Sequence, residues 1–245
     1  MSKTLRRIIL ILALVVMAYS VYQLGVIVYD YARAHRDNKE MTAVADGTEA
    51  DGSNMIISYL RSLFDWTRPD NQTDDSLEWA QARVIDFAAL QAKNTDIIAW
   101  IYIPNTNIDY AVTQTTNDSF YLHHNAQRRR SSSGSIFLAA SASPDFSDKE
   151  SPLYGHHMRD GSMFGSLPRF QNAEFRRNHQ FVFVYTPQAT KKYQVFEQRV
   201  VTKGKLPPNP SDAQTLTLIT CDYSVDDARY FVRAKLVSTT QPGQL

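Results

Sequence analysis

One long apolar run opens the chain, and shorter apolar runs fill its second half. Residues Ile8 to Tyr29 carry no charge, and Ser20 and Gln23 are the only clearly polar side chains among them. These 22 residues would form a helix of about 33 Å, enough to cross a hydrocarbon core of roughly 30 Å. The sequence Tyr-Asp-Tyr-Ala-Arg follows the run in place of a small-residue cleavage site, so we predict an uncleaved transmembrane helix over residues 8–29.

The flanks of this predicted span give only a weak orientation signal. Basic residues lie on both sides of it: Lys3, Arg6, Arg7, Arg33, Arg36 and Lys39. The positive-inside rule slightly favours a cytoplasmic N-terminus. The segment of residues 1–7 is too short to fold, so the part of the chain that can form a domain lies on the other side of the span. We therefore expect a single-pass protein of the cell membrane with a cytoplasmic head, residues 1–7, and an extracellular folded domain.

Residues 30–75 are rich in acidic, glycine and asparagine residues, which predicts an extracellular stalk. Within the stalk, Met55 to Trp66 has apolar residues at helical spacing, which favours a short helix packed on the domain over one lying on the membrane. A stronger helix is expected from Ser76, with Ser76 as its N-cap. Its predicted buried stripe is Trp79, Val84, Phe87, Ala88 and Leu90.

After Lys93 the pattern changes to eight short β-type runs separated by turn-rich connections. The runs are Ile97–Ile103, Ile108–Val112, Ser135–Ala139, Leu153–His156, Phe181–Tyr185, Tyr193–Val201, Leu216–Cys221 and Tyr230–Leu236. This spacing predicts a mainly β domain over residues 76–245, either a sandwich or a closed barrel. A barrel suits an extracellular domain because closure leaves no open edge.

Composition narrows the class of partner. The formal charge of +1 gives no case for binding nucleic acid, which usually needs a strongly basic face. The sequence contains no cluster of carboxylates that would indicate a metal site. The run Arg128-Arg129-Arg130 before three serines favours a solvated basic loop, and contact with anionic wall polymer or lipid is the alternative.

The single cysteine, Cys221, is either a buried packing residue or a nucleophile, because a lone cysteine cannot form an internal disulfide. Alternation along the last two runs places Cys221 on a face with Thr217 and Ile219, and Arg229 on a face with Arg233. If the two runs are neighbours, Arg229 enters the last strand where Cys221 leaves the previous one. Arg233 would lie about 13 Å further along.

A cysteine nucleophile needs a nearby group that removes its proton, and histidine is the usual one. Of the six histidines, His35 belongs to the predicted stalk and His179 to a polar turn. The pairs His123-His124 and His156-His157 remain as candidates. The second pair ends a predicted strand, where a side chain can project from a rigid support.

Several motifs together resemble the sortases, membrane-anchored cysteine transpeptidases of Gram-positive bacteria. They are the N-terminal span, Tyr154-Gly155-His156, the run Thr217 to Cys221 (TLITC) and Arg229. The segments NTDIIAWI, IDYAVTQ, GSIFL and DGSMFG, which begin at residues 94, 108, 134 and 160, are most similar to class B. The resemblance covers roughly residues 76–237.

The resemblance implies an eight-stranded sortase-type closed β-barrel with an N-terminal helix and short helical connections. By motif, Cys221 matches the nucleophile, His156 the catalytic histidine and Arg229 the catalytic arginine. We also expect Thr220 and Tyr223 to bind substrate, although Tyr223 could simply fill the turn, and His157 is the alternative histidine. No cofactor is implied.

The implied partners are surface proteins with a C-terminal sorting signal, cleaved at a Thr–Gly or Thr–Asn bond, and an amine acceptor from a peptidoglycan precursor. The alternatives are a pilin-polymerising sortase with a pilin amine as acceptor, a membrane-anchored cysteine hydrolase, and a catalytically silent barrel that binds the wall.

Three departures from class B concern specificity. The connection from Thr202 to Thr215 is short and proline-rich where class B has a long helical one, Ala139 stands where an aspartate is common, and no clear lid of the pilin-polymerising class precedes the domain. The lid candidate Phe64-Asp65-Trp66 lacks a proline.

Overall fold

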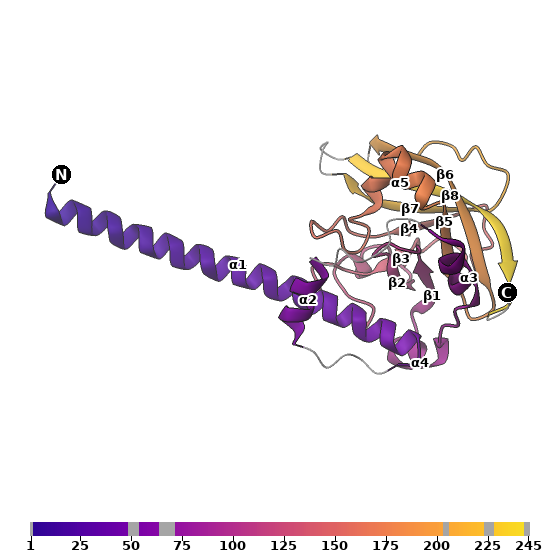
Figure 1. The fold of residues 1–245 in the computed structure, drawn as a ribbon, viewed down its shortest axis with the longest axis horizontal. Coiled ribbons are helices and arrows are strands. Elements are labelled where there is room, and N and C mark those ends of the chain that lie inside the picture. The colour runs from indigo at the N-terminus through magenta and orange to yellow at the C-terminus, as the bar shows by residue number, and fades with distance from the viewer. Residues whose placement is uncertain (1, 49–53, 64–71, 203–205, 223–227, 243–245) are drawn as a thin grey trace.

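A long N-terminal helix leads into a closed β-barrel (Figure 1). The computed structural model describes residues 2–48, 54–63, 72–202, 206–222 and 228–242, without the side chains of Arg61, Thr202, Cys221 and Asp222. The helices are α1 Lys3–Ala45, α2 Met55–Leu63, α3 Asp74–Ala82, α4 Phe87–Lys93 and α5 Ala173–Asn178, with 3-10 turns η1 Phe120–Leu122 and η2 Leu167–Gln171. The strands are β1 Ile97–Tyr102, β2 Asp109–Thr113, β3 Ile136–Leu138, β4 Glu150–Tyr154, β5 Phe181–Tyr185, β6 Thr190–Thr202, β7 Thr215–Asp222 and β8 Ala228–Thr240.

The eight predicted strand runs all fall on these strands, and the barrel closes in the order β1-β2-β3-β4-β7-β8-β6-β5. The pairs β2–β3 and β4–β7 are parallel, and the remaining pairs are antiparallel. Alternate residues of each strand point inward, because successive side chains in a strand face opposite sides. Leu216 and Leu218 of β7 thus share one core with Val232 and Ala234 of β8. The closed barrel is confirmed over the sandwich.

Helix α1 does not end with the apolar run. It continues without a break from Lys3 to Ala45, so residues 30–45 are helix and not the predicted stalk. The reason is a sparse stripe that the polar composition concealed: Ala32, Asp37, Met41 and Ala45 recur every four or five residues, share one face and are buried. The part before residue 30 is exposed and projects away from the barrel, and it is long and apolar enough to cross a membrane (Figure 1).

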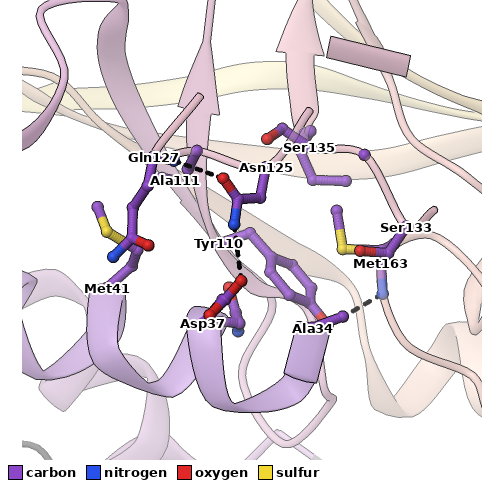
Figure 2. A pocket seen from close by; sticks show the side chains of 14 residues that line it. Ala34, Asp37, Met41, Tyr110, Ala111, Asn125, Gln127, Ser133, Ser135 and Met163 are labelled. Carbon is purple, nitrogen blue, oxygen red and sulfur yellow. Dashed lines mark hydrogen bonds between the residues drawn. The ribbon is translucent and has the colours of Figure 1, made fainter. Parts of the chain in front are cut away.

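Asp37 fixes α1 on the barrel. Its carboxylate accepts hydrogen bonds from Asn125 Nδ2 and Arg129 Nη2, both at 2.7 Å (Figure 2 shows the first). Burial raises the pKa of Asp37, and the Arg129 charge opposes that shift. Beside this contact α1 and the barrel enclose a cavity of about 30 Å³, which Met41 and Tyr110 help to line. The composition of this segment does not reveal that the Asp37 carboxylate is buried, because its hydrogen-bond donors lie in a distant loop.

Helix α2 confirms the short helix predicted from residue 55, and it packs on α1 near its point of entry into the domain. The Tyr59 ring lies 6.3 Å from Tyr31 and 6.0 Å from His35, and Lys39 Nζ donates to Ser58 Oγ at 2.9 Å. Burial and the nearby Asp160 carboxylate raise the pKa of Tyr59 to about 12. The predicted continuation to Trp66 lies outside the described residues.

The helix expected from Ser76 is two helices, and the prediction of one continuous buried stripe is wrong. Thr73 is the N-cap of α3, and Ser76 completes the capping box from the third helical position. The chain then breaks at Arg83, which is buried and pairs with Asp46 at 2.9 Å and Asp109 at 2.7 Å. The helix therefore ends where the Arg83 guanidinium forms its two ion pairs. Of the expected stripe, Phe87 and Leu90 on α4 are buried, whereas three members are exposed: Trp79, Val84 and Ala88.

Candidate active site

Three neighbouring strands bring the predicted catalytic residues to one end of the barrel. In the parallel pair β4–β7, Tyr154 is level with Ile219, and Gly155 N donates to Ile219 O at 3.1 Å. His156 follows Tyr154 by two residues, and Cys221 follows Ile219 by two residues. In the antiparallel pair β7–β8, Cys221 is directly opposite Arg229. The predicted register of Cys221 and Arg229 is therefore confirmed at the level of the backbone.

Residues of the same parity as Cys221 lie on the outer face of the barrel. Thr217 Oγ1 donates to Glu150 at 2.6 Å, and Arg233 Nε bonds the same carboxylate oxygen at 2.9 Å, whereas the intervening Leu218 belongs to the core. Alternation continues to Ile219 and Cys221. By backbone parity the Cys221 position therefore belongs to this outer face, which other parts of the chain cover at Thr217, Ile219 and Arg233, and not to the inward-facing core.

Arg229 lies over the ring of Tyr154, the last residue of β4. Its Cζ is 5.6 Å from the centroid of the Tyr154 ring, which stacks on Phe137 at 5.4 Å. Burial raises the pKa of Tyr154, and the Arg229 charge opposes that shift. Tyr154 was not among the predicted site residues. The signal that could have found it is its parity with His156, two residues later in the predicted run Leu153–His156.

The ring of His156 is held at its Nε2–Cδ2 edge. Its Nε2 lies 2.7 Å from the carbonyl oxygen of Leu122, so this nitrogen carries the proton and donates it. Gly134, at a φ of 58°, lies beside the same edge of the ring, where a Cβ would come within 2.9 Å of Leu122 O. A Cβ there would come within 2.5 Å of Tyr121 O and 3.1 Å of His156 Cδ2, so only glycine fits. The loop therefore fixes the ring and leaves Nδ1 as the nitrogen that can exchange a proton with a reacting group.

The other histidines are placed differently. His124 stacks on Phe120 at 4.0 Å and its Nδ1 bonds Phe120 O at 2.8 Å, while His123 is exposed. His179 is fully buried against Phe175. His157 follows β4 and pairs with Met163 through an isolated backbone bridge.

Of the two predicted substrate-binding residues, the structure describes only Thr220. Thr220 alternates with Cys221, is 2% exposed and is opposite Tyr230, whose ring belongs to the core. Its hydroxyl has no hydrogen-bond partner within the described part of the chain. Tyr223 lies outside the described residues. Substrate binding by either residue stays a prediction.

The short connection before β7 is tied to the sheet by Arg233. Its guanidinium pairs with Glu150 at 2.9 Å and Glu197 at 3.0 Å, and donates to Pro207 O at 2.7 Å and Pro208 O at 3.3 Å. Residues 206–214 contain no helix, in agreement with the sequence.

At the position of the missing aspartate, Ala139 is buried, and the next residue, Ala140, donates its N–H to Asp118 Oδ1 at 2.7 Å. A carboxylate from the preceding loop therefore supplies a polar contact here. Across the described residues, no group of three or more His, Cys, Asp or Glu side chains is arranged to hold a metal ion.

The sequence and the fold both match known proteins. A family model described as a sortase domain matches residues 101–237, more than half of the chain. The chain belongs to the sortase family. Sortase B of Listeria monocytogenes is 39% identical over 90 residues, and the match spans 37% of this chain and 37% of that relative. The chain thus aligns with well under half the length of this curated relative.

Two solved sortases extend the likeness to the whole barrel. Sortase B of Bacillus anthracis, in complex with AAEK1, has a TM-score of 0.57 and 30% identity over 62% of this chain and 84% of its own. Spy0129, a class B sortase of Streptococcus pyogenes involved in pilus biogenesis, has a TM-score of 0.56 and 25% identity over 62% of this chain and 98% of its own. The barrel is therefore that of a class B sortase.

Proposed function

We propose that the chain is a membrane-anchored cysteine transpeptidase of the class B type. The observation that carries the proposal is the strand register, which sets Cys221 opposite Arg229 and pairs Tyr154 with Ile219, two residues before His156 and Cys221. We assign the apolar part of α1 as a single membrane span with the N-terminus cytoplasmic and the barrel outside. The domains are then 1–7 head, 8–29 anchor, 30–75 linker, which begins as the continuation of α1, and 76–245 catalytic domain.

The reaction follows from the chemistry of these three groups. The Cys221 thiolate attacks the carbonyl carbon of the Thr–Gly or Thr–Asn bond in a sorting signal, and a tetrahedral oxyanion forms. Arg229 donates hydrogen bonds to that oxyanion, a contribution worth about 2.7–4 kcal/mol for a single donor in other acyl-transfer enzymes. Collapse breaks the C–N bond, leaves a thioester on Cys221, and releases an amine that takes a proton from His156.

The Leu122 carbonyl determines which nitrogen of His156 acts. Nε2–H donates to that carbonyl in both the neutral and the charged ring, so Nδ1–H of the imidazolium protonates the leaving amine. The nitrogen of the incoming amine then attacks the thioester and gives its proton to the neutral Nδ1. The Cys221 thiolate leaves and is regenerated. The acceptor amine belongs to a peptidoglycan precursor, so the product is a wall-linked surface protein.

Assembly of pili is the second candidate, and the likeness to the S. pyogenes class B sortase involved in pilus biogenesis favours it. The chemistry is the same, and only the amine acceptor differs. A pilin lysine in place of the peptidoglycan amine would make the product a polymer.

The test uses the full-length chain in detergent with a pool of labelled peptides that contain Thr–Gly or Thr–Asn pentapeptides. We expect a transfer product when a peptidoglycan-type amine is present, and a fall of at least about 10³-fold in cleavage for Cys221→Ala. His157→Ala is the matched control for His156→Ala and should retain activity. Hydrolysed acid as the sole product would defeat the transferase assignment, and cleavage that survives Cys221→Ala would remove the mechanism.

A further inference from the structure

A basic hollow lies where α1 enters the domain, and none of the proposed catalytic residues lines it. It has a volume of about 280 Å³. Its lining comes from one stretch of α1 and from the loop between η1 and β3: Asp30, Arg33, Ala34, Arg130, Ser131 and Ser132. We refer to it as the neck hollow.

The three consecutive arginines of the loop have separate roles. Arg128 pairs with Asp96, and Arg129 pairs with Asp37 on α1. Arg130 is exposed and, among the residues that the structure describes, forms no ion pair. Its two neighbours hold the loop on the domain, and the third arginine is left facing the neck hollow.

The remaining polar groups of the neck hollow suit a phosphate. Arg33 is likewise exposed and without an ion pair among the described residues, and the exposed Ser132 adds a hydroxyl donor. Two guanidinium groups against the single carboxylate of Asp30 leave a net charge of +1. That balance matches one phosphodiester, and guanidinium groups bind phosphate oxygens through paired N–H donors.

The height of the neck hollow on α1 selects the source of the phosphate. Arg33 stands four residues beyond Tyr29, about 6 Å along a helix. The headgroup layer on each side of a bilayer is roughly 5–8 Å thick, so Arg33 would lie at its level. At the same level α2 packs on Tyr31 and His35. Its outward side chains are 40–52% exposed and apolar: Ile56, Ile57, Leu60 and Leu63.

We infer that the neck hollow binds the phosphate of an anionic lipid headgroup in the leaflet on the domain side. The inference rests on the proposed membrane span. Basic side chains at a membrane surface attract anionic lipid, and two from separate parts of the chain would fix the domain against the bilayer at one rotation about α1. This site shares no lining residue with the proposed catalytic residues His156, Cys221 and Arg229.

The experiment reconstitutes the full-length protein in nanodiscs with equal amounts of phosphatidylcholine and phosphatidylglycerol, and counts retained lipids by native mass spectrometry. We expect preferential retention of phosphatidylglycerol by the wild type, reduced on the order of tenfold in Arg33→Gln/Arg130→Gln. The matched control Arg177→Gln/Lys235→Gln removes the same charge from exposed residues outside the hollow and should retain the lipid. Peptide cleavage in detergent should be equal in all three proteins.

Two competitors identify the source of the phosphate. Inorganic phosphate and soluble poly(glycerol phosphate) are added in separate arms. Displacement of the lipid by low concentrations of either would overturn the lipid assignment in favour of a free phosphate or a wall polymer. Equal retention of both lipids by the wild type would also overturn it and leave the span intact. A chain that fails to enter nanodiscs at all would overturn the span and this inference together, while the peptide assay reports separately on the active site.

Discussion

Arg229 and Arg233 lie on the same face of the same strand, four residues apart, and have opposite surroundings. Arg233 is fully buried and meets two carboxylates and two proline carbonyls. Arg229 is half-buried, and within the described residues its guanidinium meets the face of Tyr154 and no carboxylate. A buried guanidinium needs every donor satisfied, whereas one at a surface can turn its donors to a substrate. Pairing, more than position, separates a structural arginine from one suited to catalysis.

The largest effect should follow the loss of Arg233. Arg233→Ala leaves Glu150 without its cation and Glu197 with only Arg199, and breaking a buried pair costs about 3–5 kcal/mol. For a domain of this size that corresponds to a fall of roughly 6–20 °C in Tm. Thermal unfolding of the full-length protein in detergent measures it, and Arg229→Ala is the control from the same strand face. Equal melting of the two variants would end the comparison.

The next largest effect should follow the loss of Arg229, and it should appear in activity. Arg229→Ala removes donors to the proposed oxyanion, so kcat should fall about 10²- to 10³-fold while Tm changes little. Arg229→Lys restores the charge but not the planar fork, and should recover only part of the rate. Single-turnover cleavage of a labelled peptide measures this. A kcat that is unchanged in Arg229→Ala would rule out the proposed role.

The smallest effect concerns Tyr154, which positions Arg229. A cation–π contact at an exposed site is worth about 0.5–1 kcal/mol, so Tyr154→Leu should lower kcat/KM by only a few-fold. Tyr154→Phe keeps the ring and should match the wild type. Steady-state kinetics of the two variants separate ring from hydroxyl, and a large loss in Tyr154→Phe would show that the hydroxyl acts in its own right.

The barrel could be predicted from the sequence because each strand carries its own alternation. Phe181–Tyr185 was predicted with its observed bounds, and the register of Cys221 and Arg229 followed from counting residues along two strands. Parity also separates the outward face from the core. The alternation of side chains along a strand is enough to predict the strand and its two faces, because both depend on neighbouring residues.

Long-range contacts explain what the sequence did not reveal. Residues 30–75 were expected to be a stalk because of their polar composition, and only the contacts of Asp37 with Asn125 and Arg129 show that its first part is fastened to the barrel. The helix break at Arg83 depends on Asp46 and Asp109 in the same way. The bond from His156 to Leu122 and the contact of Gly134 with the same ring join loops 20 to 35 residues apart, a relation that no periodicity contains.

The unbroken course of α1 has a consequence for where the protein can work. The segment after the apolar run is helix and is fastened to the barrel by Asp37. Within the described residues of α1, no hinge therefore lies between the predicted span and the barrel. With α1 in a bilayer, the strand ends at Cys221 would sweep a circle at nearly constant height instead of searching a volume. Substrate and acceptor must therefore meet at that height, and the length of chain between a substrate's own membrane anchor and its cleavage site becomes a criterion of selection.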